Sequence, residues 1–149
     1  MLDKGFTIRG HHLLCMLGFR GLGYDERFVK NMIGIVAAIR RNADVTLALA
    51  DRCDDICSTC PHNTEGRCGK KPGAEDTTRK FDRTVLARLG LLPGEELTAQ
   101  CVYEAVMEHV APKDLEAELC TTCQWRGLGY CEEGLRALHA REFFVPMVG

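Results

Sequence analysis

The chain has 149 residues, of which 46% are hydrophobic and 27% charged, a balance typical of one globular domain and not of a disordered chain. A formal net charge of -2 provides no whole-molecule field that would attract polyanions. The longest apolar runs fall far short of the roughly 20 residues that span a bilayer, which excludes a membrane helix.

The first third of the chain predicts two strands and two helical segments. Thr7–Arg9 is expected to form a short strand, and His11–Gly18 a helical turn or two. Glu26–Arg41 has the apolar spacing of an amphipathic helix, and Asp25 is a plausible N-cap for it. Val45–Ala50 alternates larger apolar residues with small or polar ones, which indicates a half-buried strand.

The rest of the chain alternates cysteine loops with helices. Residues 51–76 show little apolar periodicity, and a loop of that length needs another source of order, which a bound metal would supply. A second cysteine loop spans residues 120–131. Helical spacing returns in Thr77–Leu89, Thr98–Val110, Pro112–Leu119 and Glu132–Phe144. We therefore predict a mainly α fold with a small β element of at most two strands. Residues 1–149 would form a single compact, cysteine-rich domain ordered around one or two metal sites.

Nine cysteines are the most informative part of the composition. The N-terminus has no continuous apolar stretch and no small-residue cleavage site, so it does not resemble a signal peptide, and we expect a cytoplasmic protein. Thiols stay reduced there, and clustered cysteines are more often metal ligands or catalytic groups than disulfides. The odd number also prevents disulfides from using them all.

Six of the cysteines form two segments with the same spacing, C-x2-C-x7-C. They are Cys57, Cys60 and Cys68 in the first segment, and Cys120, Cys123 and Cys131 in the second. The two residues inside a C-x2-C turn let both sulfurs point at one metal, and a cysteine eight positions later can fold back over the site. The repeated triplet predicts metal binding, but its spacing does not distinguish an iron–sulfur cluster from zinc.

Six cysteines do not complete two four-ligand sites, so a further ligand is needed. Cys15 is the first candidate, because the sequence FRGLGY follows it closely and the near copy WRGLGY fills the gap in the second triplet. If residues 11–18 are helical, His11 and His12 share a face with Cys15. His12, His62 or Cys53 could also contribute, although each histidine could equally be an ordinary hydrogen-bonded residue.

Two other cysteines have competing interpretations. Cys53 with Cys57 and Cys60 forms C-x3-C-x2-C, the spacing of radical S-adenosylmethionine enzymes. Those enzymes need a partial β/α barrel after the motif, whereas this chain offers mostly helices, so we do not favour that interpretation. Cys101 is expected on the apolar face of its helix, as a buried and inert thiol.

These strings resemble the DUF1284 family of small bacterial and archaeal proteins. The resemblance rests on IRGHHLLCMLGFRGLGY, DDICSTCPHNTEGRC and CTTCQWRGLGYC, and it covers nearly the whole chain. It implies an iron–sulfur cluster, with [4Fe–4S] favoured, and no established activity. Cys53 is not part of the family pattern, which lowers its weight as a ligand. The implied ligands are Cys15, Cys57, Cys60, Cys68, Cys120, Cys123 and Cys131.

Three functions are therefore compared. The first is an iron–sulfur protein that transfers electrons or senses redox state with an unidentified redox or protein partner. The second is a structural zinc module for protein or nucleic-acid interaction. The third is a thiol enzyme that uses Cys15 beside His11 or His12, but no catalytic motif supports it. We do not expect a nucleic-acid partner, because the short basic stretch from Arg67 to Lys80 is better explained as a solvated loop.

Overall fold

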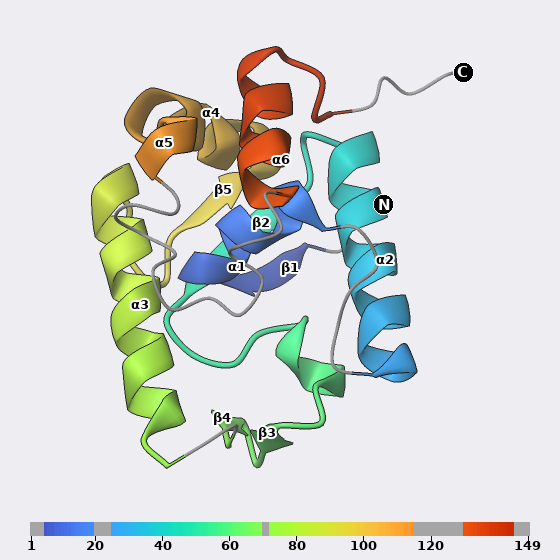
Figure 1. Cartoon of the computed structure of the whole chain (residues 1–149), viewed down its shortest axis with the longest axis vertical. Coiled ribbons are helices and arrows are strands. Elements are labelled where there is room, and N and C mark those ends of the chain that lie inside the picture. Colours follow the sequence, from blue (N-terminus) through green and yellow to red (C-terminus); the bar gives the residue numbers. More distant parts are fainter. Residues whose placement is uncertain (1–4, 20–24, 70–71, 115–129, 145–149) are drawn as a thin grey trace.

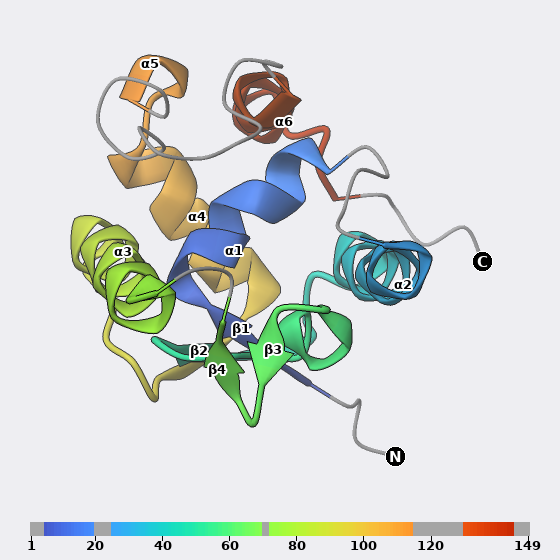
Figure 2. The same cartoon turned by 60° about the horizontal axis from the view of Figure 1, so that its bottom comes forward.

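The computed structural model describes residues 5–19, 25–69, 72–114 and 130–144. A three-stranded sheet lies at the centre, with helices on both sides and above it, and a small hairpin at the opposite end (Figures 1 and 2). The predicted fold class, mainly α with a small β element, is confirmed.

The central sheet has the order β1-β2-β5. Strand β1 (Phe6–Arg9) runs parallel to β2 (Thr46–Ala50), with Ile8 opposite Leu49. Strand β5 (Glu96–Thr98) pairs antiparallel with the other edge of β2. The prediction of at most two strands in the sheet was wrong, because the three residues of β5 are too few to show an alternating pattern.

The parallel pair β1 and β2 needs a crossover, which three helical segments supply. α1 (Gly10–Cys15) and the 3-10 turn η1 (Met16–Gly18) follow β1 directly. α2 (Glu26–Arg41) begins at the predicted N-cap, since the Asp25 side chain accepts a hydrogen bond from the Phe28 N–H at 2.8 Å.

The remaining helices are α3 (Ala74–Leu89), α4 (Ala99–His109), α5 (Pro112–Asp114) and α6 (Tyr130–His139). α3 stops at Gly90, which adopts a φ of 74°, so the helix ends at Leu89 as the sequence predicted. α6 ends before Phe144, the predicted end. The chain turns at Arg141, whose φ is 62°, and this turn stops the helix. α2 and α3 flank the sheet on opposite sides in both views (Figures 1 and 2).

The core combines the inner faces of the helices with the buried strand residues. Its fully buried members include Ile8, Leu13, Leu14, Ile39, Leu47, Leu86, Val102 and Tyr103. Among the described residues, five charged ones are buried as well: Arg9, Asp51, Asp54, Glu75 and Asp82. Within the described ranges, none of the helices has the length and apolar character needed to cross a membrane.

Candidate metal centre

The loop after β2 brings the first cysteine triplet into a tight turn. Asp54 begins this turn by accepting the Cys57 N–H at 2.9 Å, and the Cys60 N–H donates to the Cys57 carbonyl at 2.9 Å. The 3-10 turn η2 (Cys57–Thr59) therefore holds the C-x2-C pair in one compact unit. The His62 N–H lies 3.4 Å from the Cys60 sulfur, a donor position suited to a thiolate.

A two-stranded hairpin returns the chain to this turn. Strands β3 (Asn63–Thr64) and β4 (Arg67–Cys68) pair so that Asn63 lies opposite Cys68. The turn between them uses left-handed backbone at Glu65 (φ 51°) and Gly66 (φ 81°). The Asn63 side chain donates to the Cys57 carbonyl at 3.0 Å, which ties the hairpin to the cysteine turn. The Cys68 N–H in turn donates to Glu75 of α3 at 2.8 Å.

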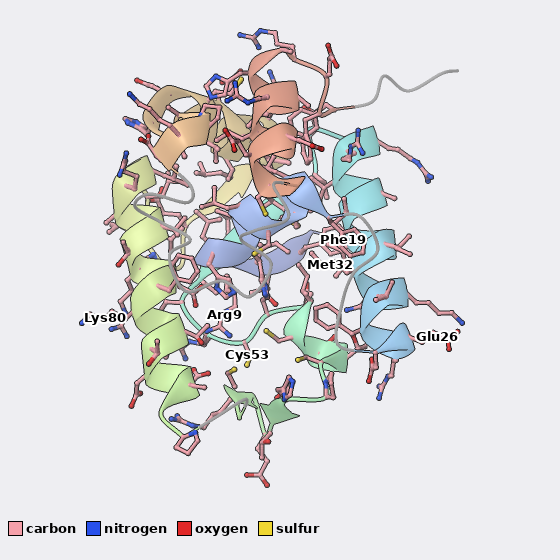
Figure 3. All side chains as sticks on the ribbon, in the orientation of Figure 1. Arg9, Phe19, Glu26, Met32, Cys53 and Lys80 are labelled. Atoms are coloured by element: carbon pink, nitrogen blue, oxygen red, sulfur yellow. The ribbon has the colours of Figure 1, made fainter. Side chains whose placement is uncertain are left out.

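A buried arginine reaches this loop from the end of β1. The Nη1 atom of Arg9 lies 3.6 Å from the sulfur of Cys53 and 3.6 Å from that of Cys57. Figure 3 shows Arg9 directed at Cys53, with further sulfur atoms around that residue between η2, the hairpin and α3. We define Cys53, Cys57, Cys60 and Cys68 as the cysteine group.

Arg9 also forms an ion pair with a buried carboxylate. Its Nε donates to Asp82 of α3 at 2.7 Å, and the side chains of both residues are at most 1% exposed. Asp82 also accepts the backbone N–H of His11 at 3.1 Å and contacts His11 Nδ1 at 2.6 Å. Of the guanidinium nitrogens of Arg9, only Nη2 has no hydrogen-bond partner among the described residues. A buried donor left this way costs about 1–3 kcal/mol, so the fold keeps a cationic donor that has no acceptor.

Asp54 is the second buried carboxylate at this site. It accepts the Arg9 N–H at 2.7 Å and contacts His12 Nδ1 at 2.8 Å. Burial alone would raise the pKa of Asp54, but the charge and hydrogen bond of His12 and the N–H groups of Arg9 and Cys57 outweigh it and lower the pKa to about 2. Asp54 is therefore an ionised group that fixes both the cysteine turn and His12.

The thiols of the cysteine group affect one another. Burial raises the pKa of Cys53, Cys57 and Cys60, and the charge of Arg9 opposes this rise at Cys53 and Cys57. The negative charge of Cys68 also raises the pKa of Cys53 and of Cys60. Such mutual effects require the groups to be near one another. A metal that binds here must displace protons from these thiols.

Access to the cysteine group is partial. Cys57 is 9% exposed, and the other three cysteines are half-buried. The tightest group of possible metal ligands is a different one: donor atoms of His12, Asp54 and Cys57 all lie within 4.8 Å of one another. In the part of the chain that the structure describes, no three cysteine sulfurs form a group this tight.

The other predicted ligands lie elsewhere or outside the described residues. Cys15 ends α1, and Cys131 is in the first turn of α6, which packs against η1. α6 and the β3–β4 hairpin are at opposite ends of the molecule (Figure 1). Cys120 and Cys123 are outside the described residues, so their relation to Cys15 and Cys131 stays a prediction.

Cys101 is exposed, which contradicts the expectation of a buried thiol. α4 begins at Ala99, so its buried positions are Ala99, Val102, Tyr103 and Val106. These follow the i, i+3, i+4, i+7 spacing of one helix face, and Cys101 falls outside it.

The polar residues around the cysteine group were not anticipated from the sequence. Arg9, Asp54 and Asp82 are charged types that usually lie on the surface, so composition gave no reason to place them inside. Arg9 follows an apolar strand residue and Asp54 follows Cys53, but neither position forms a recognisable motif. Cys53, which the sequence left as a possible ligand of low weight, lies beside Cys57 and within reach of Arg9.

Comparison with known proteins gave one match. The sequence profile of a family described as "Protein of unknown function (DUF1284)" matches residues 23–129. No curated protein and no solved structure matches the chain.

Proposed function

Since this chain belongs to the DUF1284 family, whose description assigns no activity, we propose a function from the geometry of its cysteine group. The protein binds an iron–sulfur cluster of the [4Fe–4S] type and transfers electrons or senses redox state. The ligands are Cys53, Cys57, Cys60 and Cys68, four thiols drawn from one loop. A bound cluster would supply a one-electron centre with a potential set by its surroundings.

The observation that carries this proposal is the orientation of Arg9 toward the thiols. Four thiolates make any bound centre anionic, and a buried cation with an unused donor is the matching partner. Nη1 lies 3.6 Å from two of the sulfurs, and Nη2 is the donor left for a further acceptor. N–H groups that face sulfur are among the features that set the potential of such clusters.

The spread of the sulfurs supports a cluster over a single ion. A tetrahedral zinc ion has Zn–S bonds of about 2.3 Å, which places its sulfurs about 4 Å apart. Among the described residues, no three sulfurs of the cysteine group lie within 4.8 Å of one another, although Cys53 and Cys57 share a side-chain hydrogen bond. A four-iron cluster carries its ligands on the outside of a cube, so it suits thiols that do not converge on one point.

Zinc remains the second candidate, and one observation favours it. His12, Asp54 and Cys57 supply a nitrogen, an oxygen and a sulfur within 4.8 Å, a donor set that zinc accepts. On this alternative the site would be structural, in a module for protein or nucleic-acid interaction.

Metal analysis of the anaerobically purified protein separates the two candidates. The iron–sulfur proposal predicts a brown protein with iron and acid-labile sulfide in equal amounts and a visible absorption that bleaches on reduction. Substitution of Cys53 by Ser should lower the iron content, whereas Cys101→Ser should leave it unchanged, since Cys101 is an exposed thiol on α4. A colourless protein with stoichiometric zinc would contradict the proposal and support the alternative.

The sequence also predicted Cys15, Cys120, Cys123 and Cys131 as ligands, without assigning them to one site. We propose that these four form a second site, as a separate part of the proposal. Cys15→Ser tests it directly: a loss of part of the iron supports the second site, and an unchanged iron content rejects Cys15 as a ligand.

A further inference from the structure

Three guanidinium groups meet on one carboxylate beside the cysteine group. Asp51 directly follows β2 along the chain, and its side chain is 10% exposed. Arg83 Nε lies 2.8 Å from Asp51 Oδ2, and Arg79 Nη2 lies 3.5 Å from the same oxygen. Arg52 Nε lies 3.7 Å from Oδ1. One negative charge faces three positive charges, so this group carries a net charge of about +2.

The positive side of this group faces solvent. The side chain of Arg52 is 69% exposed and that of Arg83 is 54% exposed. We define Arg52, Arg79 and Arg83 as the arginine patch. Lys80 adds an exposed amine on the same helix and points outward in Figure 3. The excess positive charge is thus a surface property.

The patch is rigidly held and adjoins the cysteine group. Arg79 Nε donates to the Asp51 carbonyl at 3.0 Å, which joins α3 to the end of β2. Arg79 and Arg83 are four residues apart on α3, where like charges repel unless an anion bridges them. Asp51 supplies that anion, because its two carboxylate oxygens contact the guanidinium groups of all three arginines. Arg52 immediately precedes Cys53, so the patch borders the proposed centre.

We infer that the arginine patch is the docking surface for an acidic one-electron carrier protein. This inference rests on the proposed function, because the carrier exchanges its electron with the cluster beside the patch. One electron passes from the reduced iron of the carrier to the oxidised cluster, and no bond forms or breaks. Carboxylates of the carrier bind the exposed guanidinium groups, and the opposite charges speed the encounter.

An acidic protein fits this patch better than a nucleic acid does. Nucleic-acid surfaces track a phosphate backbone with an extended positive groove, whereas here the charge surrounds a single carboxylate. The formal net charge of the whole chain is -2, which disfavours a long polyanion but leaves a local attraction for a carboxylate surface.

The test is the rate at which a reduced plant-type [2Fe–2S] ferredoxin, used as an acidic carrier, reduces the cluster-loaded full-length protein in stopped flow. Arg79→Gln/Arg83→Gln should lower the second-order rate constant about tenfold or more at low ionic strength and flatten its salt dependence. Arg41→Gln is the matched control, because Arg41 is an exposed arginine at the far end of α2. This control should leave the rate unchanged.

The methyl viologen radical, a cationic reductant, shows whether the substitutions damage the cluster itself. Its rate should stay constant or rise in the double variant. An unchanged ferredoxin rate in that variant overturns the docking inference, and so does an equal loss with both reductants. A single-stranded oligonucleotide that slows the ferredoxin reaction only through these arginines would assign the patch to nucleic acid instead. A protein that carries no cluster would overturn the proposed function. That outcome is distinct from a failure of the docking inference, in which the cluster is present.

Discussion

The two ends of α1 are buried by different kinds of neighbour. At the first end, Arg9 and His11 contact the Asp82 carboxylate of α3. At the other end, Leu13 and Leu14 are fully buried, and the Tyr103 hydroxyl donates to the Leu13 carbonyl at 2.8 Å. The six residues of α1 therefore adjoin a buried charge network at one end and an ordinary apolar core at the other.

The two ends of α1 are therefore stabilised in different ways. At the apolar end the packing is tight, since α6 lies so near η1 that a Cβ on Gly134 would collide with the Leu17 carbonyl. At the polar end buried ion pairs hold the elements together, and among the described residues Nη2 of Arg9 has no hydrogen-bond acceptor there. The two ends should therefore respond to different kinds of substitution.

The largest expected effect is on metal content at the polar end. Cys57 is the most buried of the four cysteines, and Arg9 and Asp54 both contact it. Cys57→Ser should reduce iron at this site to background, as measured by iron and sulfide analysis of the purified protein. Full iron in this variant would show that the polar end does not hold the cluster.

Loss of the Arg9 charge should give the next largest effect. Arg9→Gln leaves Asp82 buried without its cation, so we expect a destabilisation of about 3–5 kcal/mol in urea unfolding. The double variant Arg9→Gln/Asp82→Asn removes both charges and should recover much of that loss. Reduction of its cluster, once loaded, should become harder, because the cation that favours the extra electron is gone. Equal destabilisation in the single and double variants would contradict the charge-pair interpretation.

The apolar end should respond to shape. Gly134→Ala places a methyl group against the Leu17 carbonyl and should destabilise the protein by about 1–3 kcal/mol, measured by thermal unfolding. Gly34→Ala makes the same change in α2, where a Cβ meets nothing within 4 Å, and should stabilise by up to about 1 kcal/mol. Effects of the same sign would argue against close packing at Gly134.

The polar end should also give a pH dependence. Burial and the charge of His12 lower the pKa of His11 to about 4, from an ordinary value of 6.5. The unfolded chain binds this proton more readily, so the stability from neutral His11 is complete above pH 6.5 and is lost as the pH falls to about 4. We expect a loss on the order of 2 kcal/mol across this window, and His11→Asn should reduce it. Identical pH profiles for the two proteins would exclude His11 as the source.

The smallest effect should come from the hydroxyl of Tyr103. Tyr103→Phe keeps the ring and removes one buried hydrogen bond to Leu13, which should cost about 1 kcal/mol in urea unfolding. Iron bound at the cysteine group should not change, because this contact lies at the apolar end. A loss of that iron in Tyr103→Phe would show that the two ends of α1 are not independent.

Local patterns predicted most of the fold. The Asp25 cap, the start of α2 and the glycine that ends α3 depend on residues within a few positions of one another. β5 was not predicted, because it is ordered by its pairing with β2 and not by its own sequence.

The site was predicted only in part, for a similar physical reason. The spacing of Cys57, Cys60 and Cys68 is local and predicted a shared site, whereas the neighbours of Arg9 are 44 to 73 residues away. Burial of a charged residue depends on such distant partners. Cys101 was placed on the wrong face because it lies four residues after Leu97, an apolar residue that would share its helix face but belongs to β5, before the helix begins.

The distances along the chain between Arg9 and its partners also set an order of events during synthesis. The four thiols are all present once residue 68 has been made, and short loops join them. Arg9 cannot be neutralised until Asp82 follows, 73 residues after it. Contacts between remote residues form late in folding. A growing chain thus presents its thiols before the buried cation is in place to face them, and the pairing of Arg9 with Asp82 closes the site last.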